Sequence, residues 1–196
     1  MKSPVYWHPA IYNLLMRFLY GKNFEARYRA IAELIPDNAN VTEVCAGDGY
    51  LFRKYLKKKN IKYIGLDINS SFVKYGQQNN IPIMKHDLFT DEIPSSDYVI
   101  IHGSLCQFIP NHEVIVKKLL AASKNVLLIA EPVRNLSSSS NPLVAFIAKY
   151  SANPGDNHAV HRFNKDTLID FFQHFREFKE VKEMDGGREL IGIFRK

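Results

Sequence analysis

The chain has 196 residues, of which 46% are hydrophobic and 23% charged, values typical of a globular protein with a single core. No apolar run approaches the ~18 residues of a membrane-spanning helix, and residues 1–9 lack the apolar stretch of a secretory signal. The net charge of +6 lies entirely in residues 1–62, where it would attract an anionic small molecule, a nucleic acid or a phospholipid surface. Two cysteines exclude a disulfide scaffold, and no Cys/His cluster has zinc spacing. We therefore expect a cytoplasmic protein without a metal ion, as a monomer or a homodimer.

Two helix-like stretches come first, at residues 10–20 and 24–35, with Gly21 between them as a hinge. The second stretch carries an apolar stripe that we expect to face the core, formed by Tyr28, Ile31, Ala32 and Ile35. The first is apolar on two sides and therefore needs a second partner. We predict that it is a mobile lid over a substrate site; the alternative is a helix held between the core and a dimer mate. Residues 1–40 would form this helical cap, and residues 41–196 the rest of one domain.

From residue 41 onward, strand-like and helix-like segments alternate, which indicates βαβ units and a parallel sheet. We expect strands at 41–45, 63–67, 81–86, 98–102 and 125–131, and helices at 51–59, 71–79 and 113–122. The runs 98–101 and 126–130 are continuously apolar, as strands covered on both faces are. The predicted fold class is therefore α/β.

The alternation of strand-like and helix-like segments ends after residue 131. Loops at 135–141 and 151–161 flank a short apolar helix at 142–150. Asn164 is expected to cap a helix that extends to His174. The alternating segment 178–184, the turn Asp185-Gly186-Gly187 and the segment 189–194 then predict an antiparallel hairpin at the end of the sheet.

The residues that suggest chemistry follow the first two strands. Gly47 and Gly49 let the backbone turn sharply and approach a ligand, and ligands of open α/β sheets bind at the carboxyl ends of the strands. Asp67 ends the second strand, where a carboxylate can accept both hydroxyls of a ribose. Glu43 is an acid inside the first strand, and Phe52 replaces the third glycine of the dinucleotide fingerprint, which disfavours a dinucleotide. The alternative is that Glu43 is a surface residue and Asp67 only a helix N-cap.

These segments resemble the motifs of class I S-adenosylmethionine-dependent methyltransferases. Residues 41–49 are similar to motif I, 63–68 to the second motif, 85–88 to the segment with an aspartate after the third strand, and 98–105 to the fourth strand. The resemblance covers residues 41–131, about half of the chain. It implies a Rossmann-like fold, with a mostly parallel seven-stranded sheet, a C-terminal antiparallel hairpin and preceding helices. Cys45 departs from the pattern because it stands at the first glycine, a position that tolerates small residues.

The resemblance implies S-adenosylmethionine as the cofactor and S-adenosylhomocysteine as the product. Asp67 would bind the ribose, Asp87 the adenine amino group, and Glu43 the amino end, directly or through water. His102 would lie near the sulfonium. The full set of implied cofactor-binding residues is Glu43, Ala46, Gly47, Gly49, Asp67, Ile68, Asp87, Leu88, His102, Gly103 and Ser104.

Methyl transfer from a sulfonium is an in-line displacement, for which positioning and sometimes one base are enough. The candidate catalytic bases are His102, His158 and His161, each of which is alternatively a structural or surface histidine. His102 also stands where metal-dependent catechol enzymes carry an aspartate ligand, so the resemblance predicts no divalent metal. No Asn-Pro-Pro-Tyr follows the fourth strand, which disfavours methylation of exocyclic base amines.

The expected function is methyl transfer to an oxygen or nitrogen nucleophile of a small-molecule acceptor. Arg17 would contact the acceptor if the acceptor is anionic. The candidates for recognition are Tyr6, Trp7, His8, Tyr12, Arg17, Lys22, Arg27 and Arg29, whereas Lys57, Lys58 and Lys59 are interpreted as solvated residues that complement a helix dipole. Two alternatives stay open. One is an RNA or lipid methyltransferase that uses the basic first third, and the other is a noncatalytic scaffold that binds S-adenosylmethionine.

Overall fold

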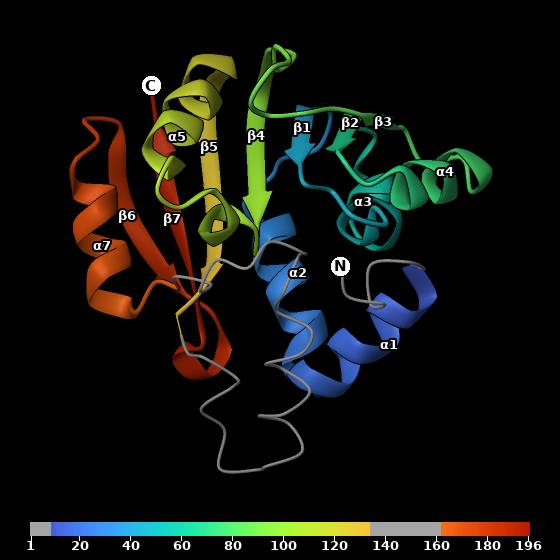
Figure 1. Ribbon diagram of the computed structural model, residues 1–196, viewed down its shortest axis with the longest axis horizontal. Coiled ribbons are helices and arrows are strands. Elements are labelled where there is room, and N and C mark those ends of the chain that lie inside the picture. The colour runs from blue at the N-terminus through green and yellow to red at the C-terminus, as the bar shows by residue number, and fades with distance from the viewer. Residues whose placement is uncertain (1–8, 134–161) are drawn as a thin grey trace.

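A computed structural model describes residues 9–133 and 162–196, which surround a seven-stranded sheet of order β3-β2-β1-β4-β5-β7-β6 (Figure 1). The strands are β1 (Asn40–Val44), β2 (Lys62–Asp67), β3 (Ile83–Lys85), β4 (Ser96–His102), β5 (Ser123–Pro132), β6 (Phe178–Glu183) and β7 (Glu189–Arg195). Strands β1 to β5 pair in parallel, and β7 pairs antiparallel with both β5 and β6. The predicted mostly parallel sheet with a terminal antiparallel hairpin is confirmed.

Helices cover both faces of the sheet. The described helices are α1 (Pro9–Tyr20), α2 (Asn23–Glu33), α3 (Tyr50–Lys54), α4 (Ser70–Gln78), α5 (His112–Ala122) and α7 (Lys165–Gln173), with 3₁₀ turns η2 (Leu56–Lys59), η3 (Leu105–Phe108) and η5 (Asp185–Gly187). Side chains of α5 and α7 share one core cluster with the sheet, and side chains of α2 and α3 share another on the opposite face. The helices α1 and α2 lie beyond the strand ends to which β1 and β4 point (Figure 1).

The central strands are buried on both faces, as their uninterrupted apolar sequences predict. Val99 and Ile101 of β4 face α5 and α7, and Ile100 between them faces α2; all three are fully buried. Burying a side chain of this size contributes about 1.5–3 kcal/mol. The stripe predicted on the second helix is also buried, with Ile31 and Ile35 both at 0% exposure. The hydrophobic pattern thus fixes which surfaces meet.

The helix predicted to begin after Asn164 is present as α7. The Asn164 side chain accepts a hydrogen bond from the Thr167 amide at 2.8 Å, and the Thr167 hydroxyl accepts one from the Asn164 amide at 3.0 Å. This capping box satisfies two amides that the first turn leaves without partners. Phe172 of α7 then packs on Gly192 of β7, where a Cβ would lie 2.5 Å from its ring. The glycine therefore lets α7 approach the hairpin closely.

The prediction of one continuous helix at 51–59 is wrong. The segment is divided into α3 and η2 at Tyr55, whose φ of −121° is not helical. The Tyr55 hydroxyl reaches Glu25 Oε2 at 2.5 Å, and Leu56 turns into the core with 0% exposure. Lys59 also differs from the prediction, because its Nζ donates to the carbonyls of Ala32 and Ile35 rather than staying solvated. It therefore complements the carboxyl end of α2, not of its own helix.

Several predictions fall outside the described residues. They are the helix at 142–150, both flanking loops, the histidines His158 and His161, and the recognition candidates Tyr6, Trp7 and His8. Among the described residues, no helix is long and apolar enough to cross a membrane.

Candidate functional site

The carboxyl ends of the parallel strands meet where the order of the sheet reverses. Strand β1 pairs with β2 on one side and with β4 on the other, and the chain leaves these strands at the same edge. This is the switch point where open α/β sheets form their ligand-binding crevice. The loops after β1, β2, β3 and β4 bring together the residues that the sequence pointed to.

The loop after β1 depends on positive backbone φ angles. Gly47 and Gly49 have φ angles of 58° and 66°, and Cys45 has 54°. A Cβ on Gly49 would lie 2.6 Å from Ile81 Cγ2, whereas a Cβ on Gly47 would meet no atom within 4 Å. Gly49 is therefore required by packing, and open space lies beside Gly47. Cys45 also has a left-handed backbone conformation, which is uncommon for a residue other than glycine.

Asp67 joins the ends of β1 and β2. Its Oδ2 accepts a hydrogen bond from the Gly47 amide at 2.8 Å, and its Oδ1 accepts one from the Asn69 amide, also at 2.8 Å. Burial raises the pKa of Asp67, and the two amides lower it. Each carboxylate oxygen keeps a further lone pair that a ligand hydroxyl can use. The structure thus brings together Gly47 and Asp67, which the sequence predicted to share a site.

Glu43 lies within β1 and is buried, so the alternative of a surface residue is wrong. Its Oε2 accepts a hydrogen bond from the Tyr63 hydroxyl at 2.5 Å. Phe52 stacks on the Tyr63 ring with centroids 4.4 Å apart. Burial raises the pKa of Glu43 to about 8, and the negative charges of Asp48 and Asp67 add to the rise. The side chain therefore holds a proton at neutral pH.

The loop after β3 carries the residues predicted to contact adenine. Asp87 Oδ1 accepts a hydrogen bond from the Phe89 amide at 2.9 Å, and Leu88 is buried. Phe89 is 57% exposed and meets the edge of the Phe108 ring at 5.6 Å. Ile68, which follows Asp67, is 58% exposed at the same sheet edge. Apolar groups that stay exposed beside a polar loop suit the binding of a flat ring.

His102 ends β4 and belongs to a buried network that the sequence did not predict. Its Nε2 lies 2.8 Å from Glu189 Oε1 and 2.8 Å from Arg27 Nη2. Arg27 Nε lies 2.9 Å from Glu189 Oε2, and both side chains are at most 8% exposed. Arg27 comes from α2 and Glu189 from the start of β7, so no local pattern links them. Arg27 is therefore a buried partner of Glu189 and not an exposed recognition residue.

The network has a defined charge. Burial lowers the pKa of His102, and so does the positive charge of Arg27, while Glu189 opposes both. Burial alone would raise the pKa of Glu189, but Arg27 and His102 lower it to about 2. At neutral pH the three groups are therefore a neutral imidazole, a carboxylate and a guanidinium. A neutral histidine can accept a proton.

Glu131, at the end of β5, is a second buried acid that the sequence analysis did not single out. The amide of Leu105 donates to its Oε1, and its Oε2 has no hydrogen-bond partner among the described residues. Burial raises the pKa of Glu131 to about 8. An acid at the end of an otherwise apolar strand was the signal that could have identified it.

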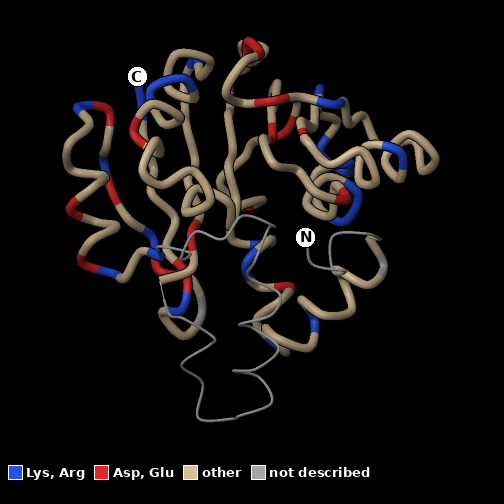
Figure 2. Tube along the Cα trace, in the orientation of Figure 1, with Lys and Arg blue, Asp and Glu red and all other residues tan. Residues whose placement is uncertain are grey.

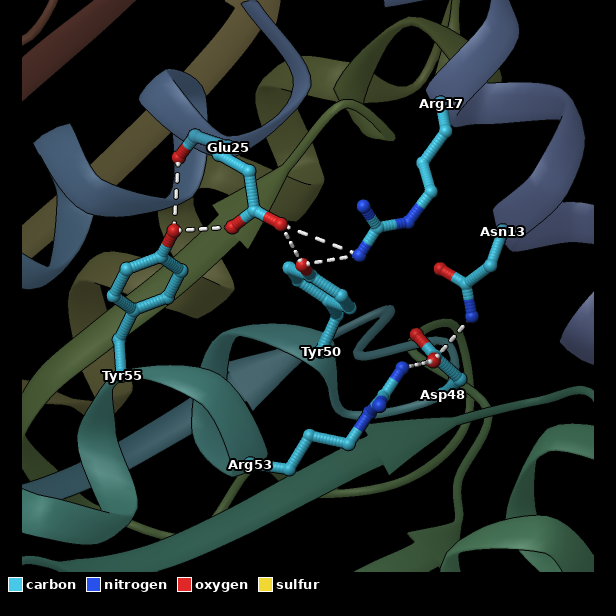
Figure 3. A network of polar contacts seen from close by, with 7 residues as sticks. All are labelled: Asn13, Arg17, Glu25, Asp48, Tyr50, Arg53 and Tyr55. Atoms are coloured by element: carbon cyan, nitrogen blue, oxygen red, sulfur yellow. Dashed lines mark hydrogen bonds and ion pairs between the residues drawn. The ribbon is translucent and has the colours of Figure 1, made fainter. Parts of the chain in front are cut away.

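The first helix lies over the glycine loop (Figure 3). Asn13 Nδ2 donates to Asp48 Oδ2 at 2.6 Å, and Arg53 contacts the same oxygen at 2.6 Å. Arg17 donates to the Tyr50 hydroxyl at 2.8 Å and pairs with Glu25 at 3.2 Å. Both contacts use Arg17 Nη2, and the side chain stays 50% exposed, so contact of Arg17 with an anionic acceptor stays a prediction.

The two apolar sides of α1 differ in their surroundings. Tyr12 meets Phe72 of α4 edge to face at 5.5 Å, and Leu19 is buried. Ile11, Leu14 and Phe18 are more than half exposed on the other side. Among the described residues, no three His, Cys, Asp or Glu side chains are arranged to hold a metal ion.

A family model described as methionine biosynthesis protein MetW matches residues 25–133, which include β1 to β5 and all four loops. A comparison with curated protein sequences gave no match.

Solved structures share the fold at low sequence identity. A chain of the complex that contains the Haloferax volcanii methyltransferase activator Trm112 has a TM-score of 0.70 and 11% identity over 100% of this chain and 98% of its own length. Magnesium protoporphyrin IX methyltransferase from Synechocystis was solved with bound S-adenosylhomocysteine. It has a TM-score of 0.66 and 13% identity, over 97% of this chain and 96% of its own length. The [4+2]-cyclase SpnF has a TM-score of 0.67 and 10% identity, over 88% of this chain and 80% of its own length. The chain therefore has the class I methyltransferase fold, which also supports other chemistry.

Proposed function

The chain belongs to the family of the methionine biosynthesis protein MetW, and from that premise we propose that it transfers a methyl group from S-adenosylmethionine to an oxygen or nitrogen nucleophile of a small-molecule acceptor. The observation that carries the proposal is the contact between the Gly47 amide and Asp67 at the switch point of the sheet. It links the glycine loop to a carboxylate that has lone pairs left for a ribose. The chain would form one domain, with residues 1–40 as a cap on residues 41–196.

The residues at this edge suit the cofactor. Open space lies beside Gly47, so its backbone is accessible to a ligand. In the proposal Asp67 binds the ribose, and Asp87 and Leu88 bind the adenine. The remaining contacts come from Glu43, Ala46, Gly49, Ile68, His102, Gly103 and Ser104. S-adenosylmethionine, when bound, supplies an electrophilic methyl group.

The protein's part in the reaction is positioning and proton removal. The acceptor must lie in line with the transferred methyl group, which removes most of the entropic barrier. His102 is the proposed base, because the charge of Arg27 and burial keep its imidazole neutral. If the Nε2 proton faces Glu189, Nδ1 is the nitrogen that takes the proton from the acceptor. His158 and His161 are proposed as alternatives for this role.

The placement of the basic residues supports a small acceptor over RNA or a lipid surface. Figure 2 shows basic residues gathered over α3 and η2, within the first third of the chain. Two cations of this third are held within the chain: Arg27 pairs with Glu189, which lies outside the first third, and Lys59 Nζ donates to the carbonyls of Ala32 and Ile35. The charge left over for phosphates is therefore smaller than the sequence suggests.

Titration calorimetry with S-adenosylhomocysteine tests the proposal. We expect saturable binding, and Asp67→Ala should weaken it by about 2 kcal/mol or more because a charged acceptor makes the stronger hydrogen bonds. Asp170→Ala, at an exposed position of α7, is the matched control and should bind as the parent does. Equal affinity of a folded Asp67→Ala variant would remove the assignment. Binding without methyl transfer to any fraction of a small-molecule extract would favour a noncatalytic scaffold.

A further inference from the structure

Two arginines contact the last residue of α1, Tyr20, near the proposed methyl-transfer point. The guanidinium carbons of Arg27 and Arg188 lie over the Tyr20 ring, 4.0 Å and 5.1 Å from its centroid. Burial raises the pKa of Tyr20, and the charges of Arg27, Arg188 and Arg162 all oppose that rise. The charges of the three arginines therefore act on one half-buried aromatic side chain.

The negative charge at this place is smaller than the positive charge. Glu189 is ionised, but Arg27 and His102 already contact it. Glu131 holds a proton at neutral pH because burial raises its pKa to about 8. Arg188 has a nitrogen, Nη2, that is buried and makes no hydrogen bond to the described residues. A buried guanidinium N–H without a partner among the described residues is costly, and a bound anion would offset that cost.

The position of Arg188 connects this excess charge to the reaction site. Its carbonyl accepts a hydrogen bond from the Val133 amide at 2.9 Å, just past the end of β5. The next residue, Glu189, lies 2.8 Å from His102 at the end of β4. Arg188 therefore lies at the same edge of the sheet as the glycine loop, beside the proposed base.

We propose that Arg188 binds a carboxylate of the methyl acceptor, with Arg162 adding positive charge, so that the acceptor is a small carboxylic acid. The proposal rests on the proposed function for its methyl acceptor, although the anion site itself does not. A guanidinium presents two parallel N–H groups that match the two oxygens of a carboxylate. Arg188 would thus bind the anionic group that was also predicted to contact Arg17, whose Nη2 pairs with Glu25 and Tyr50.

The test uses sodium acetate as the probe, at constant ionic strength, with protein saturated by S-adenosylhomocysteine. In a ¹⁵N NMR titration, the Nε–Hε signal of Arg188 should shift with saturation. Arg188→Gln should weaken acetate binding at least tenfold. Arg195→Gln, which removes an exposed arginine at the far end of β7, should leave it unchanged. Inorganic phosphate titrated in parallel separates a carboxylate site from a phosphate site, and tighter phosphate binding at Arg188 would overturn the choice of carboxylate.

The outcomes separate this proposal from the proposed function. Failure of the parent to bind S-adenosylhomocysteine would count against the function, while acetate titration of the cofactor-free protein would still decide the anion site. An unmoved Arg188 signal would overturn the anion site, as would equal acetate affinity in a folded Arg188→Gln variant. That result would mean that a group of the protein, and not an anion, satisfies Arg188 Nη2.

Discussion

Arg27 and Glu189 form a buried ion pair although 162 residues separate them in the sequence. Arg27 Nε lies 2.9 Å from Glu189 Oε2, and the two side chains are 8% and 3% exposed. The pair joins α2, which precedes the sheet, to the first residue of the last strand. Because His102 contacts Glu189, the same pair fixes the side chain at the end of β4. The helical segment before the sheet is thereby anchored to the site rather than merely adjacent to it.

Removing one member of this pair should destabilise the protein strongly. Arg27→Ala leaves Glu189 charged and buried without its main partner, which costs about 3–5 kcal/mol of unfolding free energy. Urea denaturation followed by circular dichroism measures the loss. The double variant Arg27→Met/Glu189→Leu should lose less than either single variant, because it leaves no unpaired charge.

A surface pair supplies the control for that experiment. Arg195 and Glu180 lie 3.8 Å apart and are 53% and 60% exposed. Arg195→Ala should change the unfolding free energy by less than ~1 kcal/mol, as is usual for exposed pairs. Similar losses for Arg27→Ala and Arg195→Ala would show that the buried pair has no special role.

Glu43 should make the protein less stable as the pH rises. The folded state raises the pKa of Glu43 to about 8, through burial and the charges of Asp48 and Asp67, while the unfolded chain releases the proton near pH ~4.3. The folded state thus binds the extra proton, and its stabilising effect, complete below the unfolded pKa, is lost as the pH passes 8. In Glu43→Gln, the fall in melting temperature between pH 5 and pH 8.5 should be smaller than in the parent.

Two further variants check the assignment. Glu131 also has a pKa raised to about 8, so Glu131→Gln should reduce the same pH dependence. Glu33→Gln, at an exposed position of α2, should leave it unchanged. If Glu43→Gln and Glu33→Gln have parallel melting profiles, Glu43 is already ionised at neutral pH in the folded protein.

Local sequence predicted the sheet and the glycine site because both depend on nearby residues. The apolar runs 98–101 and 126–130 form the centre of the sheet, and Asn164 caps its helix through residues three positions away. Gly47 and Asp67 meet because consecutive parallel strands end at one edge. The buried network could not be predicted in this way. Arg27 looks in the sequence like any helical arginine, and only the tertiary fold brings Glu189 to it.

The same reason explains the other errors. The helix predicted at 51–59 breaks at Tyr55, which contacts Glu25 of α2, 30 residues earlier in the sequence. The partners of Arg17, Glu25 and Tyr50, were not predicted either, because they are 8 and 33 residues away in the sequence. Long-range pairs of polar residues leave no periodicity in a sequence, whereas burial of apolar strands and caps of helices do.

The two glycines of the loop should respond differently to alanine. Gly49→Ala combines a left-handed φ of 66° with a Cβ 2.6 Å from Ile81, so the folded state should lose about 1–3 kcal/mol from overpacking in addition to backbone strain. Gly47→Ala meets no neighbour, and strain at its φ of 58° should cost about 1–2 kcal/mol. Thermal unfolding and calorimetry with S-adenosylhomocysteine separate the two effects. For Gly47→Ala, the loss in free energy of S-adenosylhomocysteine binding should exceed the loss in free energy of unfolding. The opposite order would contradict a ligand beside Gly47.

The position of α1 over the glycine loop leads to a prediction about cofactor release. Asn13 Nδ2 donates to Asp48 Oδ2 at 2.6 Å, so the helix is joined to the glycine loop that is proposed to contact the cofactor (Figure 3). Gly21, with a φ of 53°, lies directly after α1, where a change in backbone angle would move the helix. If α1 is a lid, breaking its contact with the loop should speed opening and leave the closed geometry intact.

Asn13→Ala should therefore raise the dissociation rate of S-adenosylhomocysteine about fivefold, because the lost hydrogen bond contributes about 1 kcal/mol, and should leave the association rate unchanged. Stopped-flow displacement measures both rates. Ile11→Ser, on the exposed side of the same helix, is the control and should leave dissociation unaltered. These two single substitutions test the lid more specifically than deletion of residues 1–20 would. Deletion also removes Leu19, which is buried, and Tyr20, which contacts Arg27. Unchanged dissociation in Asn13→Ala would favour a fixed helix, and a concentration-dependent change in mass would then identify a dimer mate on Ile11, Leu14 and Phe18.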